Sequence, residues 1–169
     1  MLKLTDKTAI IGHTGWYDLI NGNVDKSYFW PNGFPDFSRI GEFLGMSSYF
    51  KKQICGELTT DASKFLEDQL LEAFRTYETV VLGTHVPPYR EASWHAGKIS
   101  DDHGAPFFSN YIMGEKLNQV MALFPNKKLI VLAGHTHSSI LYQPKPNIDV
   151  HVAAAEYGSP SISQIFEIE

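Results

Sequence analysis

Residues 129–139, LIVLAGHTHSS, decide the fold of this chain. The stretch opens with five apolar residues, which predict a buried strand. The chain then reaches Gly134, which permits a tight turn, and presents His135 and His137 one residue apart. Two imidazoles that leave the carboxyl end of a buried strand lie where open α/β sheets bind their ligands. The stretch therefore predicts a metal site at a strand end, rather than two solvated loop histidines.

Two other apolar runs end in a similar way. They are AIIGHTG at residues 9–15 and VVLGTHV at residues 80–86. The second run places His85 directly before Val86 and two prolines, which force the chain to leave in an extended conformation. We therefore expect His85 to be held at the end of its strand.

The order of elements favours an α/β fold that becomes all-β towards its end. Amphipathic helices are predicted at residues 61–77 and 110–124, where apolar side chains keep to one face. Thr59 or Thr60 can cap the first of them. Strands are predicted at residues 8–11, 79–82, 129–133, 140–142, 148–154 and 161–168.

Composition limits the classes of function. The 169 residues, 43% of them hydrophobic, suit one globular domain over residues 1–169. A net charge of −5 with scattered basic residues gives no electrostatic footprint for nucleic acid. The sequence shows no signal peptide and no run of membrane-span length, so we expect no membrane partner. The single cysteine, Cys55, suits a reducing compartment, and together these features predict a cytoplasmic protein.

Three short motifs resemble one known family. They are GWYD at residues 15–18, GTHVP at 83–87 and GHTH at 134–137. In these the chain is similar to the C-terminal half of a calcineurin-like metallophosphoesterase domain. The resemblance implies a four-layer α/β/β/α sandwich with two divalent ions, Mn, Zn or Fe, at the carboxyl ends of its central strands. It also implies that His85 and His135 ligate one ion and that His137 ligates the other.

The family's first three motifs, Asp-x-His, Gly-Asp-x-x-Asp and Gly-Asn-His, do not occur in their places here. They supply the remaining ligands, the carboxylate that bridges the ions, and a histidine that assists the leaving group. The one formal Asp-x-His, at residues 101–103, falls in a polar loop. We therefore expect a metallophosphoesterase-like sandwich that is incomplete at its N-terminus and holds one or two ions.

Three functions remain open. The first is a phosphoesterase that hydrolyses a phosphomonoester or phosphodiester by a metal-activated hydroxide, with a complementing N-terminal half from another chain or an omitted segment. The second is a non-catalytic, truncated family member that binds one metal or a partner chain. The third is a mononuclear hydrolase with three histidine ligands. Half a sandwich leaves apolar sheet surface uncovered, so a homo-oligomer is also expected.

Four further residues are candidates for contact with a phosphoester substrate. His13 follows a strand and a glycine, as His135 does, and we interpret it as a wall residue of the site rather than a ligand. Tyr89, Trp94 and His95 lie in or beside a long polar loop, where they either contact the organic group of a substrate or pack the loop down. The sequence identifies no catalytic residue beyond the metal ligands.

Overall fold

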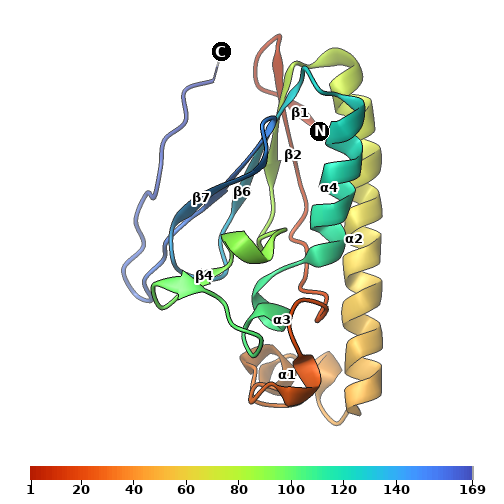
Figure 1. Cartoon of the computed structure of the whole chain (residues 1–169), viewed down its shortest axis with the longest axis vertical. Coiled ribbons are helices and arrows are strands. Elements are labelled where there is room, and N and C mark those ends of the chain that lie inside the picture. Colours follow the sequence, from red (N-terminus) through yellow and green to blue (C-terminus); the bar gives the residue numbers. More distant parts are fainter. Residues whose placement is uncertain (169) are drawn as a thin grey trace.

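A six-stranded mixed sheet forms the centre of the computed structural model, which describes residues 1–168 (Figure 1). Its strands run in the order β1-β2-β3-β6-β8-β7. The four inner strands are parallel, and both edge strands are antiparallel to their neighbours. The α/β class predicted from the sequence is confirmed. The strands are β1 (Leu2–Lys3), β2 (Thr8–Gly12), β3 (Thr79–Gly83), β6 (Lys128–Ala133), β7 (Ile140–Lys145) and β8 (Ile148–Val152).

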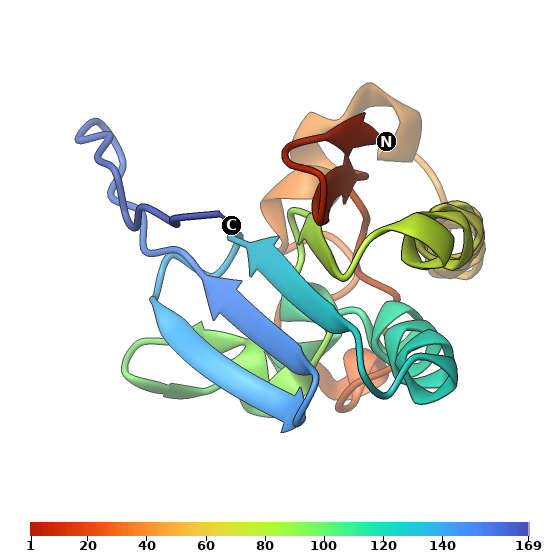
Figure 2. The same cartoon turned by 90° about the horizontal axis from the view of Figure 1, so that it is seen from above.

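Two long helices, α2 (Ser48–Thr76) and α4 (Tyr111–Leu123), pack side by side on one face of the sheet (Figure 2). Alternate strand residues, such as Val80 and its register partner Leu129, are buried beneath them. The Asn110 side chain caps α4 by accepting a hydrogen bond from the Met113 amide at 2.8 Å. The core between sheet and helices is thus built by strand alternation and two apolar helix stripes.

Helix α2 begins well before the predicted start at residue 61, so that expectation was wrong. Ser47 is its N-cap, with a side-chain oxygen that accepts from the Phe50 amide at 3.5 Å. The early turns are stabilised by tertiary contacts that helix periodicity does not reveal. Lys51 is 1% exposed and donates to the Pro31 carbonyl and the Asn32 side chain, while Cys55 is fully buried.

A second hydrophobic core lies beyond the carboxyl ends of the inner strands, and we call it the aromatic cluster. It joins the loop after β2 to the short helices α1 (Pro35–Arg39) and α3 (Ala105–Phe108) and to the start of α2. Smaller elements complete this end of the molecule. The aromatic cluster comprises Tyr17, Leu19, Phe34, Phe37, Phe43, Cys55, Val86 and Phe107. The smaller elements are η1 (Val24–Lys26), η2 (Gly41–Phe43), η3 (Arg90–Ala92), β4 (Trp94–His95) and β5 (Lys98–Ile99).

The predicted strand at residues 161–168 does not form, so that expectation was wrong, and the segment pairs with no strand of the described chain. This segment, which we call the C-terminal segment, instead approaches the sheet face opposite the helices. Phe166 and Ile168 line a cavity of about 240 Å³ there, together with sheet residues that include Ile10, Val81 and Ile130. No helix within residues 1–168 has the length and apolar character needed to cross a membrane.

Candidate functional site

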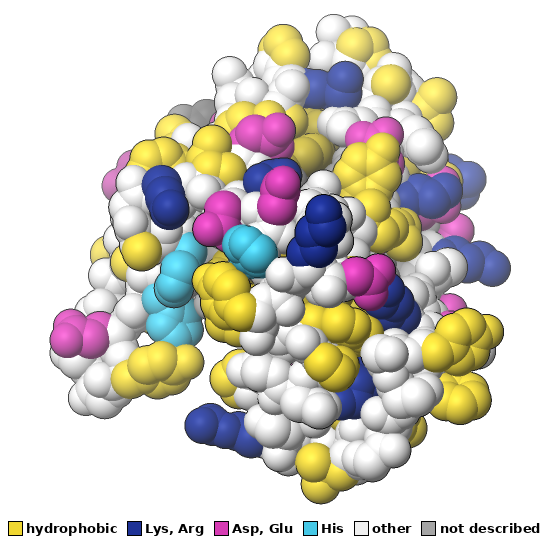
Figure 3. Space-filling view, turned by 60° about the horizontal axis from the view of Figure 1, so that its bottom comes forward, with side chains coloured by type: hydrophobic (Ala, Val, Ile, Leu, Met, Phe, Trp, Pro, Cys, Tyr) yellow, Lys and Arg dark blue, Asp and Glu magenta, His cyan; other side chains and the backbone are white. Residues whose placement is uncertain are grey.

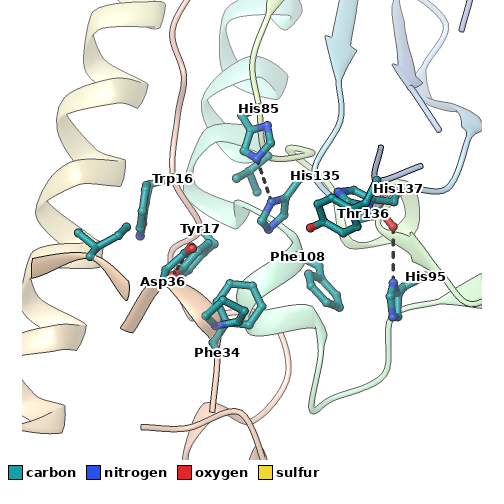
Figure 4. Close-up of a pocket in the computed structure, with 14 residues that line it drawn as sticks. Trp16, Tyr17, Phe34, Asp36, His85, His95, Phe108, His135, Thr136 and His137 are labelled. Carbon is teal, nitrogen blue, oxygen red and sulfur yellow. Dashed lines mark hydrogen bonds between the residues drawn. The ribbon is translucent and has the colours of Figure 1, made fainter. Parts of the chain in front are cut away.

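Two histidines meet where β3 and β6 end. These strands are parallel neighbours, so the residues that follow them emerge at the same edge of the sheet. The Nδ1 atom of His135 lies 3.1 Å from the Nε2 atom of His85 (Figure 4). The predicted convergence of these two side chains is therefore present in the fold.

The hydrogen bond of His135 Nε2 determines which ring nitrogen of His135 carries the proton. Nε2 of His135 lies 2.8 Å from the carbonyl oxygen of Phe107 in α3. Because a carbonyl only accepts, Nε2 carries the proton and Nδ1 keeps a free lone pair directed at His85. Metal-bound histidines commonly donate their other N–H to a carbonyl in this way.

Both imidazoles are neutral near pH 7. Burial lowers the pKa of His135 to about 4, although the bond to the Phe107 carbonyl opposes the shift. Burial also lowers the pKa of His85, against the attraction of the Asp36 carboxylate. Neutral imidazole is the form that binds metal ions, so the environment favours the ligand state of both rings.

The turn after β6 has an unusual backbone. His135 and His137 adopt φ values of 71° and 59°, in the left-handed region that residues other than glycine seldom occupy. The Thr136 amide between them donates to the Gly134 carbonyl at 2.8 Å. Strain of this kind concentrates at functional sites, where the surrounding structure holds the backbone in place.

The histidines open onto a cavity of about 530 Å³ at this end of the sheet. Histidine side chains gather there beside hydrophobic ones (Figure 3). Of the charged types, Asp36 is the one carboxylate in the lining, and neither Lys nor Arg belongs to it. The lining comprises Trp16, Tyr17, Phe34, Pro35, Asp36, Ile40, His85, Val86, His95, Phe108, His135, Thr136, His137 and Tyr157.

Asp36 is a site residue that sequence reasoning missed. It lies in the first turn of α1, and its Oδ2 accepts a hydrogen bond from the Tyr17 hydroxyl at 3.1 Å. Nothing in its local sequence distinguishes it from a solvated loop carboxylate. It reaches the cavity because the loop after β2 folds back onto the aromatic cluster.

Two more histidines line the cavity without joining the pair. The His137 ring packs against Tyr157, with centroids 4.7 Å apart. The His95 ring lies against Phe108, and its Nδ1 is 3.5 Å from the Thr136 carbonyl oxygen. The Thr136 side chain is almost fully buried, and its hydroxyl oxygen has no hydrogen-bond partner within residues 1–168.

Three of the predicted substrate contacts lie outside this cavity. His13 is exposed, accepts from the Gly15 amide at 3.0 Å, and packs against Phe65 of α2. Tyr89 is buried and donates to Asn118 Oδ1 at 3.1 Å, and it lines a different cavity of about 330 Å³. Trp94 is half-buried in β4. Of the four predicted substrate contacts, the fold brings only His95 to the histidine pair.

The loop carboxylates have structural roles. Asp18 is 6% exposed and accepts from the amides of Ile20 and Ile112, which ties the loop after β2 to the start of α4. Asp101 caps its own loop by accepting from the His103 and Gly104 amides, each at 3.0 Å. Neither carboxylate lines the cavity at the histidine pair.

The pair fits part of a metal site. Two nitrogen ligands of one tetrahedral zinc ion lie about 3.4 Å apart, and the 3.1 Å between His85 and His135 is close to that value. Across residues 1–168, no group of three or more His, Cys, Asp or Glu side chains is arranged to hold a metal ion. The pair therefore offers two ligand positions, and a third requires a rearranged side chain.

Comparisons with known proteins do not identify a family. No protein-family model matches the chain, and no curated protein matches it.

Proposed function

We propose that this chain is a metal-dependent phosphoesterase. The observation that carries the proposal is the 3.1 Å approach of His135 Nδ1 to His85 Nε2 at the carboxyl ends of two adjacent parallel strands. The motif resemblance described above supports it, because the same two histidines are the ones that it implies as ligands of a common ion. The cavity beside them has the volume of a small-molecule site.

His85 and His135 hold the ion in this proposal. A bound ion would polarise a phosphoryl oxygen and lower the pKa of a bound water, so that hydroxide forms near pH 7. The Phe107 carbonyl keeps the His135 ring in its ligand orientation. His137 lies nearby and is not a ligand in this proposal, because its ring packs on Tyr157. The chain binds one ion rather than two, since imidazoles provide no negative charge to hold a second dication nearby.

The proposal extends to the four-layer sandwich that the resemblance implies. In that fold a second sheet covers the face opposite the helices. The apolar side chains of Ile10, Val81 and Ile130 on that face support this arrangement. A complementing N-terminal half or a second copy of the chain would supply the cover.

Metal content and turnover test the proposal together. We expect about one equivalent of Zn²⁺ or Mn²⁺ after loading and dialysis, measured by elemental analysis. His85→Ala and His135→Gly should lose the ion, with glycine chosen at 135 because φ is positive there. His13→Ala is the matched control, because His13 lies outside the cavity and should leave metal content unchanged.

Hydrolysis of bis(p-nitrophenyl) phosphate should be slow and should disappear with the ion. Two tightly held ions with rapid turnover would contradict the one-ion site and direct attention to His13, Asp101 and His103. Protein that takes up no metal would favour the non-catalytic alternative. Equal loss of metal in His85→Ala, His135→Gly and His137→Gly would favour the mononuclear three-histidine hydrolase.

A further inference from the structure

We infer that the cavity selects a phosphodiester whose ester group is aromatic or apolar and carries no additional negative charge. This inference rests on the proposed function, because the histidine pair supplies the phosphoryl end of the site. The remaining walls of the cavity determine which organic group is accepted.

The walls of the cavity are aromatic, and buried rings of the aromatic cluster pack against two of them. Phe34 lines the cavity and stacks on Phe107 of the aromatic cluster, with ring centroids 4.8 Å apart. Trp16 lines it as well and stacks on Phe43 at 6.1 Å. Phe108 adds a third ring close to His135, at 5.8 Å. Preformed aromatic surfaces favour flat apolar groups, which stack on them at little entropic cost.

The charges of the cavity exclude polyanionic groups. Sites for diphosphates and triphosphates use Arg or Lys to neutralise the phosphate oxygens, and neither residue type lines this cavity. Lys51 donates to the Pro31 carbonyl and Lys52 pairs with Asp25. Arg39 of α1 is exposed and does not belong to the lining. A second phosphate would therefore lie beside aromatic rings and the Asp36 carboxylate, which repels it.

The same charge balance favours a diester over a monoester. A divalent ion held by the histidine pair would, together with the Asp36 carboxylate of the lining, leave one net positive charge at the cavity. A phosphodiester monoanion neutralises that charge, whereas a monoester dianion leaves a negative excess beside Asp36. The structure therefore assigns Asp36 as a specificity-determining residue, although it holds no ion itself.

The Thr136 hydroxyl is a buried donor beside the histidine pair, which a substrate oxygen would reach after a local rearrangement of the turn. It belongs to a residue that lines the cavity between His135 and His137, it is buried, and it has no partner among the described residues. A buried hydroxyl without a partner carries a desolvation cost that a bound oxygen would remove. An oxygen of the phosphodiester fits this requirement.

Tyr157 is placed to contact the ester group at the rim of the cavity. It belongs to the chain after β8, is 90% exposed, and packs its ring on His137. An exposed ring at the rim can turn to cover an aryl group that already stacks on Phe108. The ester group is thus enclosed between a fixed wall and a movable ring.

Calorimetric binding to the Zn²⁺-loaded protein tests the selection. Methyl 1-naphthyl phosphate should bind at least about tenfold more tightly than dimethyl phosphate. It should also bind more tightly than the monoester 1-naphthyl phosphate. Asp36→Asn should reduce the preference for the diester, and Phe108→Leu should reduce the preference for naphthyl, both with zinc content unchanged. Phe50→Leu, on the exposed start of α2, is the control.

A metal-free measurement separates this inference from the proposed function. 1-Naphthol carries no phosphate, so its binding to metal-free protein tests the aromatic wall alone. If zinc does not bind, the proposed function fails, but naphthol binding that is weakened in Phe108→Leu would still support the apolar wall. Naphthol that does not bind, equal affinity for the naphthyl and dimethyl diesters, or tighter binding of the monoester would overturn the inference.

Discussion

His85 Nε2 and His135 Nδ1 form a hydrogen bond of 3.1 Å across fifty positions of sequence. Because the Phe107 carbonyl takes the Nε2–H of His135, Nδ1 of His135 accepts and His85 donates its Nε2–H. A metal ion at this place would replace the proton between the two rings. His85 must then carry its proton on Nδ1.

This exchange of tautomer can be observed directly. Long-range ¹⁵N–¹H spectra of the metal-free protein should show both His85 and His135 as Nε2–H tautomers. Addition of Zn²⁺ should convert His85 to the Nδ1–H form and leave His135 unchanged. If the tautomer of His85 stays the same while zinc binds, the ion is held somewhere else.

A glycine pair provides a sharp test of packing. A Cβ on Gly114 of α4 would clash with the Pro88 carbonyl oxygen, whereas a Cβ on Gly56 of α2 meets no atom within 4 Å. We expect Gly114→Ala to lower the free energy of unfolding by about 2–4 kcal/mol. Gly56→Ala should raise it by about 0.5–1 kcal/mol. Urea denaturation measures both, and similar stabilities would refute the close packing of α4 on the Pro88 loop.

Asp18 is expected to stabilise the fold rather than to bind metal. Asp18→Ala removes the acceptor for two backbone amides, Ile20 at 3.0 Å and Ile112 at 2.8 Å. We expect a loss of about 2–4 kcal/mol in the free energy of unfolding, because the amide of Ile112 then lacks its partner near the start of α4. Asp18→Asn, which keeps one acceptor oxygen, should lose less. Thermal unfolding measures the effect, and unchanged stability with reduced metal content would reverse this assignment.

The Cys55 thiol should be inert in the folded protein. Burial raises its pKa to about 12, and the residue is 0% exposed. A raised pKa keeps the thiol protonated across the physiological range, so the reactive thiolate is scarce even at pH 8. A thiol-reactive dye should label the protein at pH 8 only after urea is added. Rapid labelling without urea would show that the start of α2 opens readily.

Self-association remains a prediction. The sheet face opposite the helices carries Ile10 and Ile130. Phe166 and Ile168 of the C-terminal segment line the same cavity on that face. We expect association at tens of micromolar, roughly the range of weak homodimers, in sedimentation velocity. Ile130→Lys should weaken it, whereas Leu58→Lys on the exposed side of α2 should not. A clean monomer at that concentration would contradict the prediction.

The parts of the fold that follow local rules were predictable. The strands that precede His85 and His135 and the helix capped by Asn110 agree with their sequence patterns. The start of α2 was not predictable, because it depends on buried contacts of Lys51 and Cys55 with distant loops.

The candidate site also has one part that was predictable from the sequence and another that was not. Sequence spacing places His85 and His135 at strand ends, and the fold brings them together. The Phe107 carbonyl has no sequence signature, since a backbone acceptor belongs to every residue. Asp36 has none either, because its position depends on how an aromatic loop folds over the strand ends. The strand expected at residues 161–168 has the right alternation, but a strand also requires a neighbour.

The long connection between β2 and β3 has a consequence for how the molecule forms. These strands are direct parallel neighbours, yet residues 13–78, including all of α2, separate them in the chain. Closing so long a loop costs more chain entropy than forming the β7–β8 hairpin, which is local. We therefore expect β2 to join the sheet late in folding and to detach first on partial unfolding. In native-state hydrogen exchange, the amides of β2 should lose protection before those of β6 and β8. The connection that follows β2, which carries Tyr17 and Asp36 of the cavity lining, should be released at the same time.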